Sequence, residues 1–79
     1  MVVGYVFIDA APSKEFDIYT KLLEIPQIRD VHVLFGQHDL IAKIESDDYL
    51  QLADVVYEKI REIDGIIGTK TAPEAILKN

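Results

Sequence analysis

The residues with the clearest chemistry form one short turn, Gly36-Gln37-His38-Asp39. Glycine accepts the positive φ that points backbone N–H groups outward, where they form a small cup for an anion. The Asp39 carboxylate can accept hydrogen bonds from an ammonium group beside that cup. Because an α-amino acid carries both a carboxylate and an ammonium, the turn predicts a binding site for a free amino acid or a close analogue.

Four other side chains would complete this predicted site. Thr69 and Thr71 would contribute hydroxyl groups, from the same end of the sheet or from a neighbouring strand. Gln37 and His38 would line the part of the pocket that accepts the ligand's side chain and would set its specificity. A plainer interpretation stays open for each position, because glycine and aspartate are common in tight turns and threonine is common in strands.

Metal binding and catalysis have less support in the sequence. The two histidines, His32 and His38, fall on different predicted elements without a clear third ligand, and the chain has no cysteine. We therefore expect no metal site and no cofactor. Asp47 and Asp48 are explained by favourable electrostatics at a helix N-terminus rather than as an acid–base pair. Since no activated nucleophile or paired base is present, we expect no catalytic residues and no enzyme.

Length and composition predict a single domain over residues 1–79. Apolar residues make up 49% of the chain and charged residues 28%, which is typical of soluble globular proteins. The formal net charge of −6 argues against direct binding to nucleic acid or to anionic membranes. We find no signal peptide and no apolar run near the ~20 residues of a membrane span, so we expect a cytoplasmic protein. So small a domain without disulfides commonly gains stability by forming oligomers.

Four strands are predicted from runs of β-branched and aromatic residues bounded by turn residues. They cover residues 2–9, 28–35, 39–45 and 66–72. The second strand is expected to place Val31, Val33 and Phe35 on one face. Gly36-Gln37-His38 is the turn into the third strand, and residues 74–79 form a short tail.

Two helices are predicted between the strands. Ser13 is expected to cap the first helix, which ends before Pro26. Its apolar residues at helical spacing are Phe16, Tyr19, Leu22 and Leu23. Ser46 is expected to cap the second helix, which ends at Asp64-Gly65. Its predicted buried stripe consists of Leu50, Ala53, Tyr57 and Ile60.

The order β-α-β-β-α-β predicts a ferredoxin-like α+β sandwich, in which a four-stranded antiparallel sheet carries both helices on one face. The other face would then be open to solvent and should show alternating polar residues. Residues 5–8 and Leu40-Ile41 are instead apolar on both sides of their strands. We therefore expect a second copy of the chain to cover this face in a sheet-to-sheet dimer.

The chain also resembles a known family. The run Ile28-x-x-Val31-x-x-x-x-Gly36-x-x-Asp39-Leu40-Ile41-Ala42-Lys43-Ile44 and the strand Gly65-Ile66-x-x-Thr69-x-Thr71 carry this resemblance. They are similar to the ligand-binding domain of the Lrp/AsnC transcriptional regulators, also called the regulation-of-amino-acid-metabolism (RAM) domain. The similarity extends over residues 2–78. Full-length members also carry a DNA-binding helix-turn-helix, so this chain is expected to be a stand-alone RAM protein or an excised domain, and Met1 directly before the first strand favours the former.

The resemblance implies an oligomeric amino-acid-binding module that acts in transcriptional or metabolic regulation. It implies dimers with facing sheets, assembled into octamer-like rings, and effectors bound between dimers near the 36–39 turn. It also implies a full-length Lrp/AsnC regulator as a protein partner. Two alternatives stay open. One is an ACT-like regulatory domain, although the turn at 9–13 lacks the glycine usual there. The other is a small dimeric α/β-barrel enzyme, for which His32 and Asp9 are the only polar candidates.

Overall fold

Four strands and three helical segments follow one another in the computed structural model, which describes residues 1–75. The strands are β1 (Val2–Ala10), β2 (Ile28–Val33), β3 (Leu40–Ser46) and β4 (Ile66–Pro73). The helical segments are α1 (Glu15–Leu23), α2 (Tyr49–Asp54) and the π-helix η1 (Val55–Ile60), which continues α2. The last four residues of the predicted tail at 74–79 lie outside the described part of the chain.

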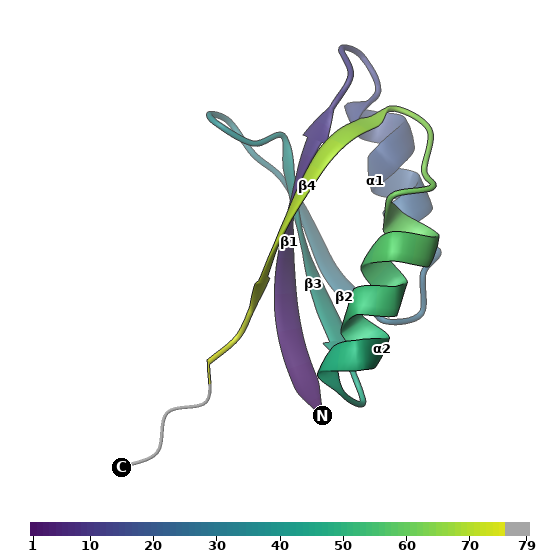
Figure 1. Cartoon of the computed structure of the whole chain (residues 1–79). Helices are drawn as coiled ribbons and strands as arrows, with labels where there is room; N and C mark the ends of the chain where they lie inside the picture. Colours follow the sequence, from purple (N-terminus) through teal and green to yellow (C-terminus); the bar gives the residue numbers. More distant parts are fainter. Residues whose placement is uncertain (76–79) are drawn as a thin grey trace.

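The sheet is antiparallel and has the strand order β2-β3-β1-β4. Figure 1 shows α1 and α2 on the same side of the sheet, and no helix of residues 1–75 lies on the other side. The predicted ferredoxin-like α+β fold is therefore confirmed. None of the helices within residues 1–75 is long and apolar enough to cross a membrane.

The core lies between the sheet and the helices. Alternate residues of β1 and β3 point toward the helices, because successive side chains of a strand face opposite sides. Val6, Ile8 and Leu40 are fully buried in this layer, and Ile18 and Leu22 of α1 belong to the same buried cluster. Burying one such aliphatic side chain contributes ~1.5–3 kcal/mol, so this layer is the main source of stability.

The helix-free side of the sheet, called the outer face below, has an apolar centre flanked by polar side chains. The strand register places Phe7 of β1 beside Ile41 of β3. His32 of β2 extends this row on one side and Lys70 of β4 on the other. Tyr5, Phe7 and Ile41 are only half-buried in the single chain. Coverage of the outer face by a second copy stays a prediction.

The first helix begins later than predicted, and Ser13 does not cap it. Ser13 has a φ of 70°, in the left-handed region, whereas a capping residue has an extended conformation. The helix begins at Glu15, and Lys14 at the N-cap position makes no side-chain hydrogen bond to the helix. The prediction is therefore wrong by one residue, because the chain turns sharply after Pro12.

The second helix is capped by Asp48 rather than by Ser46. The Asp48 carboxylate accepts a hydrogen bond from the backbone N–H of Gln51 at 2.8 Å. Ser46 is buried as the last residue of β3, and its hydroxyl donates to the backbone oxygen of Asp48 at 3.0 Å. The serine thus holds the turn that leads into the helix.

Leu22 and Ile60 are buried as predicted and Tyr19 packs against the core, but the rest of each buried helix face differs from the predicted one. The predicted residues that are exposed are Phe16, Leu23, Leu50, Ala53 and Tyr57. The buried residues are Ile18, Leu22, Leu52, Val55, Val56 and Ile60. Gly4 explains the face chosen by α2, because a Cβ there would lie only 2.5 Å from Leu52 Cδ1. In η1 the Arg61 N–H donates five residues back to Val56 O, and this wider turn keeps Ile60 on the buried face.

β2 ends two residues before the predicted position at Phe35. The register pairs Val31 with Ala42 and Val33 with Leu40, so both valines point to the helix side of the sheet, where Val31 is buried and Val33, at the end of the edge strand, is 57% exposed. Phe35 lies beyond the strand and its side chain is fully exposed. The three residues therefore do not share a buried face. β3 begins at Leu40, so Asp39 belongs to the preceding loop.

Candidate functional site

The 36–39 turn lies in the loop of residues 34–39, called the β2–β3 loop below. The Leu34 N–H donates to Asp39 O at 2.8 Å and closes the loop. The Asp39 N–H donates to Ile8 O at 3.0 Å and ties the loop base to β1. Gly36 has the predicted positive φ, at 123°. In Figure 1 the loop leans toward the helix-free side of the sheet.

Asp39 holds the end of β1. Its Oδ2 accepts a hydrogen bond from the Ala10 N–H at 2.7 Å. The β1–β4 pairing shifts register between Asp9 and Ala10, so the carboxylate acts as a hydrogen-bond acceptor where the ladder becomes irregular. Within residues 1–75 the second oxygen, Oδ1, makes no hydrogen bond. Asp39 thus has a structural contact and one oxygen open to a ligand.

His38 folds over the end of β1 on the outer face. Its Nδ1 lies 3.0 Å from Asp9 Oδ1, and the nitrogen must donate because a carboxylate only accepts. The His38 ring centroid lies 5.0 Å from that of Phe7. The His38 side chain is 22% exposed and that of Asp9 39%. Asp9 and Phe7 therefore belong to this site, although the sequence analysis did not assign them to it.

The tip of the loop presents unpaired backbone donors. Within the described chain, the N–H groups of Phe35, Gly36, Gln37 and His38 donate no hydrogen bond to protein. Successive N–H groups around a residue with positive φ form concave anion sites in proteins. A Cβ built on Gly36 would meet no atom within 4 Å, so the space around this turn is open.

Thr69 and Thr71 do not converge with the loop inside one chain. The register pairs Thr69 with Ile8 and Thr71 with Val6, whose side chains point into the core. Both threonines therefore lie on the helix side of the edge strand β4, whereas His38 lies on the outer face. Thr71 borders an apolar groove of about 290 Å³ between the second helix and β4. A site that uses the loop and these threonines needs a second chain.

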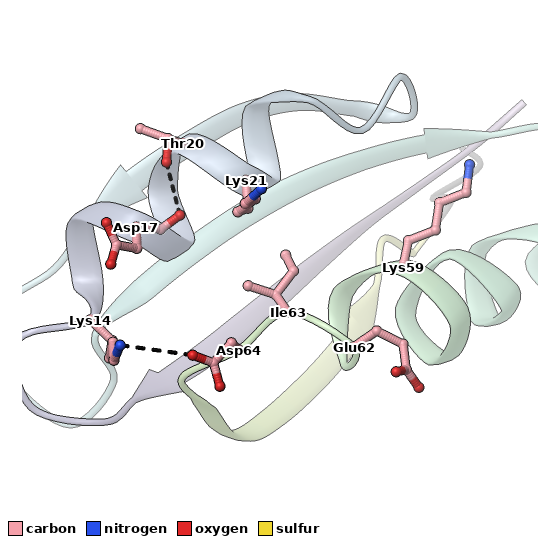
Figure 2. A pocket seen from close by; sticks show the side chains of 8 residues that line it. All are labelled: Lys14, Asp17, Thr20, Lys21, Lys59, Glu62, Ile63 and Asp64. Carbon is pink, nitrogen blue, oxygen red and sulfur yellow. Dashed lines mark hydrogen bonds and ion pairs between the residues drawn. The ribbon is translucent and has the colours of Figure 1, made fainter.

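A larger cavity, of about 450 Å³, lies away from the loop, between α1 and the end of the second helix (Figure 2). Its charged lining consists of Lys14, Lys21, Lys59, Asp17, Glu62 and Asp64. The three positive and three negative charges cancel, so the cavity does not select a charged ligand by sign. Lys14 Nζ and Asp64 Oδ2 stand 3.8 Å apart with both side chains well exposed, and such pairs contribute little.

His32 and Asp9, the residues considered for metal or enzyme chemistry, do not lie together in one cluster. Within residues 1–75 no three His, Asp or Glu side chains are arranged to hold a metal ion. His32 Nε2 lies 3.5 Å from Asp30 Oδ1 on the exposed edge strand β2. Asp9 is paired with His38 instead. His32 and Asp9 thus belong to two separate pairs rather than to one catalytic arrangement.

Comparison with known proteins identifies the family. The model of the Lrp/AsnC ligand binding domain matches residues 5–73 of the 79-residue chain. The chain belongs to this family. The HTH-type transcriptional regulator LrpA of Pyrococcus abyssi is 37% identical over 71 residues, which cover 90% of this chain and 49% of that protein. This Lrp/AsnC domain therefore spans about half the length of the curated relatives it matches, and those relatives are transcriptional regulators.

Solved structures of other proteins share the fold. Hypothetical protein PHS023 from Pyrococcus horikoshii is 36% identical, with a TM-score of 0.88 over 99% of this chain and 93% of that one. The complex of the transcriptional regulator NMB0573 with L-Met, from Neisseria meningitidis, is 14% identical, with a TM-score of 0.83 over 98% of this chain and 50% of that one. At that identity the likeness shows the fold alone. The match to the family model over residues 5–73, rather than the shared fold, favours the Lrp/AsnC domain over the ACT-like alternative.

Proposed function

We propose that this Lrp/AsnC domain is an oligomeric amino-acid-binding module of the cytoplasm that regulates transcription or metabolism through protein partners. The observation that carries the proposal is the β2–β3 loop, where within residues 1–75 the N–H groups from Phe35 to His38 donate no hydrogen bond to protein and Asp39 Oδ1 accepts none. Members of the family bind amino-acid effectors and oligomerise. The related regulator from Neisseria meningitidis, in its complex with L-Met, supports the same ligand class.

The loop offers a partner to each charge of an amino acid. The effector carboxylate would accept hydrogen bonds from the N–H groups at the tip, and the ammonium would donate to Asp39 Oδ1. Both are charge-assisted hydrogen bonds, which are roughly twice as strong as neutral ones. Gln37 is exposed and the neighbouring His38 is partly buried, and these two would meet the effector's side chain and set specificity.

A neighbouring chain would complete the site. The loop is open on its own, and Thr69 and Thr71 can approach it only from another chain, because they lie across β1 on the helix side. Phe35 supports this arrangement, since a fully exposed aromatic side chain at a loop tip is typical of residues that anchor interfaces. The proposed assembly is a sheet-to-sheet dimer, with dimers joined in an octamer-like ring that encloses the effector clefts.

At least one of the twenty amino acids should raise the melting temperature of the protein. A ligand at 100 times its Kd stabilises the folded state by ~2.7 kcal/mol. In a domain of this size each kcal/mol raises the Tm by roughly 4–8 °C, so we expect an increase of roughly 10–20 °C in a thermal-shift screen. The carboxamide and the N-acetyl derivative of the active amino acid are the controls and should give no increase. A flat response to all twenty would contradict the proposal.

The isolated chain should not bind duplex DNA, so its effect on transcription would pass through a partner such as a full-length Lrp/AsnC regulator. DNA affinity comes largely from cations that displace counterions, and this chain has a net charge of −6. In a mobility-shift assay at about physiological salt, we expect DNA to stay free at micromolar protein. An HTH-type relative on its own operator is the positive control. Salt-sensitive binding below micromolar concentration would show this expectation to be wrong.

A further inference from the structure

The β2–β3 loop is attached to the rest of the protein at two levels. At its base, backbone hydrogen bonds join Leu34 to Asp39 and Asp39 to Ile8, and the Asp39 carboxylate holds the Ala10 N–H. Beyond the base, within the described chain, the loop backbone makes no hydrogen bond to protein. The side chain of His38 is the remaining polar attachment, through its 3.0 Å contact with Asp9.

The surroundings of Asp9 suit this attachment. Asp9 pairs with Gly68 on β4, and a Cβ at Gly68 would lie 3.3 Å from Asp9 Oδ2. The missing side chain at position 68 thus leaves room for the carboxylate beside β4. Phe7 lies two residues before Asp9 on the same face, and its ring supports the imidazole at 5.0 Å. The imidazole is therefore held by one hydrogen bond and one ring contact, both from β1.

The contact between His32 and Asp30, also on the outer face, differs from the contact between His38 and Asp9 in its exposure and in the elements that it joins. His32 Nε2 and Asp30 Oδ1 are 3.5 Å apart, with side chains 66% and 62% exposed. The two partners are neighbours on one strand, so that contact fixes no loop. His38 and Asp9 are 29 residues apart in sequence and are better shielded from water, so their contact joins two elements.

We propose that Asp9 is a positioning residue for effector binding. It does not touch the effector, but through His38 it holds the loop in the conformation that keeps the N–H cup beside Asp39. This inference rests on the proposed function and adds to it a residue outside the loop. A loop that opens more often spends less time in the binding-competent state. The effector affinity falls by the factor by which the population of that state falls.

Amide hydrogen exchange without any amino acid tests the attachment itself. Asp9→Ala should accelerate exchange of the Leu34 and Asp39 amides about tenfold and leave the core amide of Val6 unchanged. Asp9→Asn, which keeps an acceptor oxygen, should lie between wild type and Asp9→Ala. Asp30→Asn is the matched control and should change neither loop amide. Unchanged loop exchange in Asp9→Ala, or acceleration throughout the sheet, would overturn the proposal.

Two further measurements separate positioning from general stability. His38→Ala should have the same effect as Asp9→Ala, and the double variant should exchange no faster than either single one, because both remove the same contact. With an amino acid that binds the wild type, Asp9→Ala should weaken binding by the factor by which the exchange rates show the closed-loop population to fall. Additive effects in the double variant, or unchanged affinity, would contradict the proposal. If no amino acid binds the wild type, the proposed function fails, while the exchange data still decide whether Asp9 holds the loop.

Discussion

Replacing Ile41 with aspartate should dissociate the protein into monomers. Ile41 lies beside Phe7 at the apolar centre of the outer face and is half-buried in the single chain. If a second copy covers this face, each dimer would bury two unpaired carboxylates. Each uncompensated buried charge costs ~3–5 kcal/mol, so even one of the two would weaken association by about 1,000-fold. Sedimentation velocity at micromolar concentration should show a wild-type dimer or larger assembly and a monomeric Ile41→Asp variant.

The matched control places the same charge on the opposite side of the molecule. Leu50 is 73% exposed on α2, so Leu50→Asp should leave the assembly intact. If Leu50→Asp dissociates the protein and Ile41→Asp does not, the interface lies on the helices and the facing-sheet arrangement is wrong. A wild-type monomer that is stably folded would remove the basis for any site shared between chains.

Replacing Asp39 with alanine should weaken effector binding by about 30-fold or more. The loss of one partner of a charge pair in a partly desolvated cleft costs roughly 2–5 kcal/mol, and ~1.4 kcal/mol is a factor of ten in Kd. Alanine also removes the acceptor of the Ala10 N–H, so a loss of ~1 kcal/mol of stability should accompany it. Calorimetric titration and thermal unfolding measure the two effects separately.

Asp39→Asn distinguishes the structural contact from the ligand contact. Its amide oxygen can still accept the hydrogen bond from Ala10, but it carries no charge for the ammonium. We therefore expect stability near that of the wild type together with the large loss of affinity. Asp47→Asn removes an equal charge from an exposed position outside the loop and should bind normally. If Asp39→Asn binds as tightly as the wild type, Asp39 is only a structural residue of the turn.

The architecture could be predicted from the sequence because its signals are local. Val6, Ile8 and Leu40 alternate with outward residues at the strand period, and the turn residues mark the ends of the strands. The buried helix faces could not be predicted in the same way. The second helix has two apolar stripes, and the one that is buried depends on the gap that Gly4 leaves for Leu52 on another element.

For the candidate site, the residue types of the turn could be predicted from the sequence, but the contacts between distant residues could not. The positive φ of Gly36 follows from the residue type and its place in a tight turn. The contact between His38 and Asp9 depends on the pairing of β1 with β3, which brings together residues 29 positions apart. Thr69 was predicted from its residue type, but its side of the sheet is set by the register with Ile8. The local sequence pattern thus does not contain the register in which strands distant in the sequence pair with one another.

A crystal structure of the protein with the amino acid that most increases its melting temperature tests the central claim most directly. We predict electron density for the ligand beside Gly36 and Asp39, between two chains. The carboxylate should lie within hydrogen-bond distance of the loop N–H groups, and the ammonium should lie next to Asp39 Oδ1. Density in the cavity between the helices, near Lys14 and Asp64, or in the apolar groove beside Thr71, with the loop unoccupied, would contradict the account.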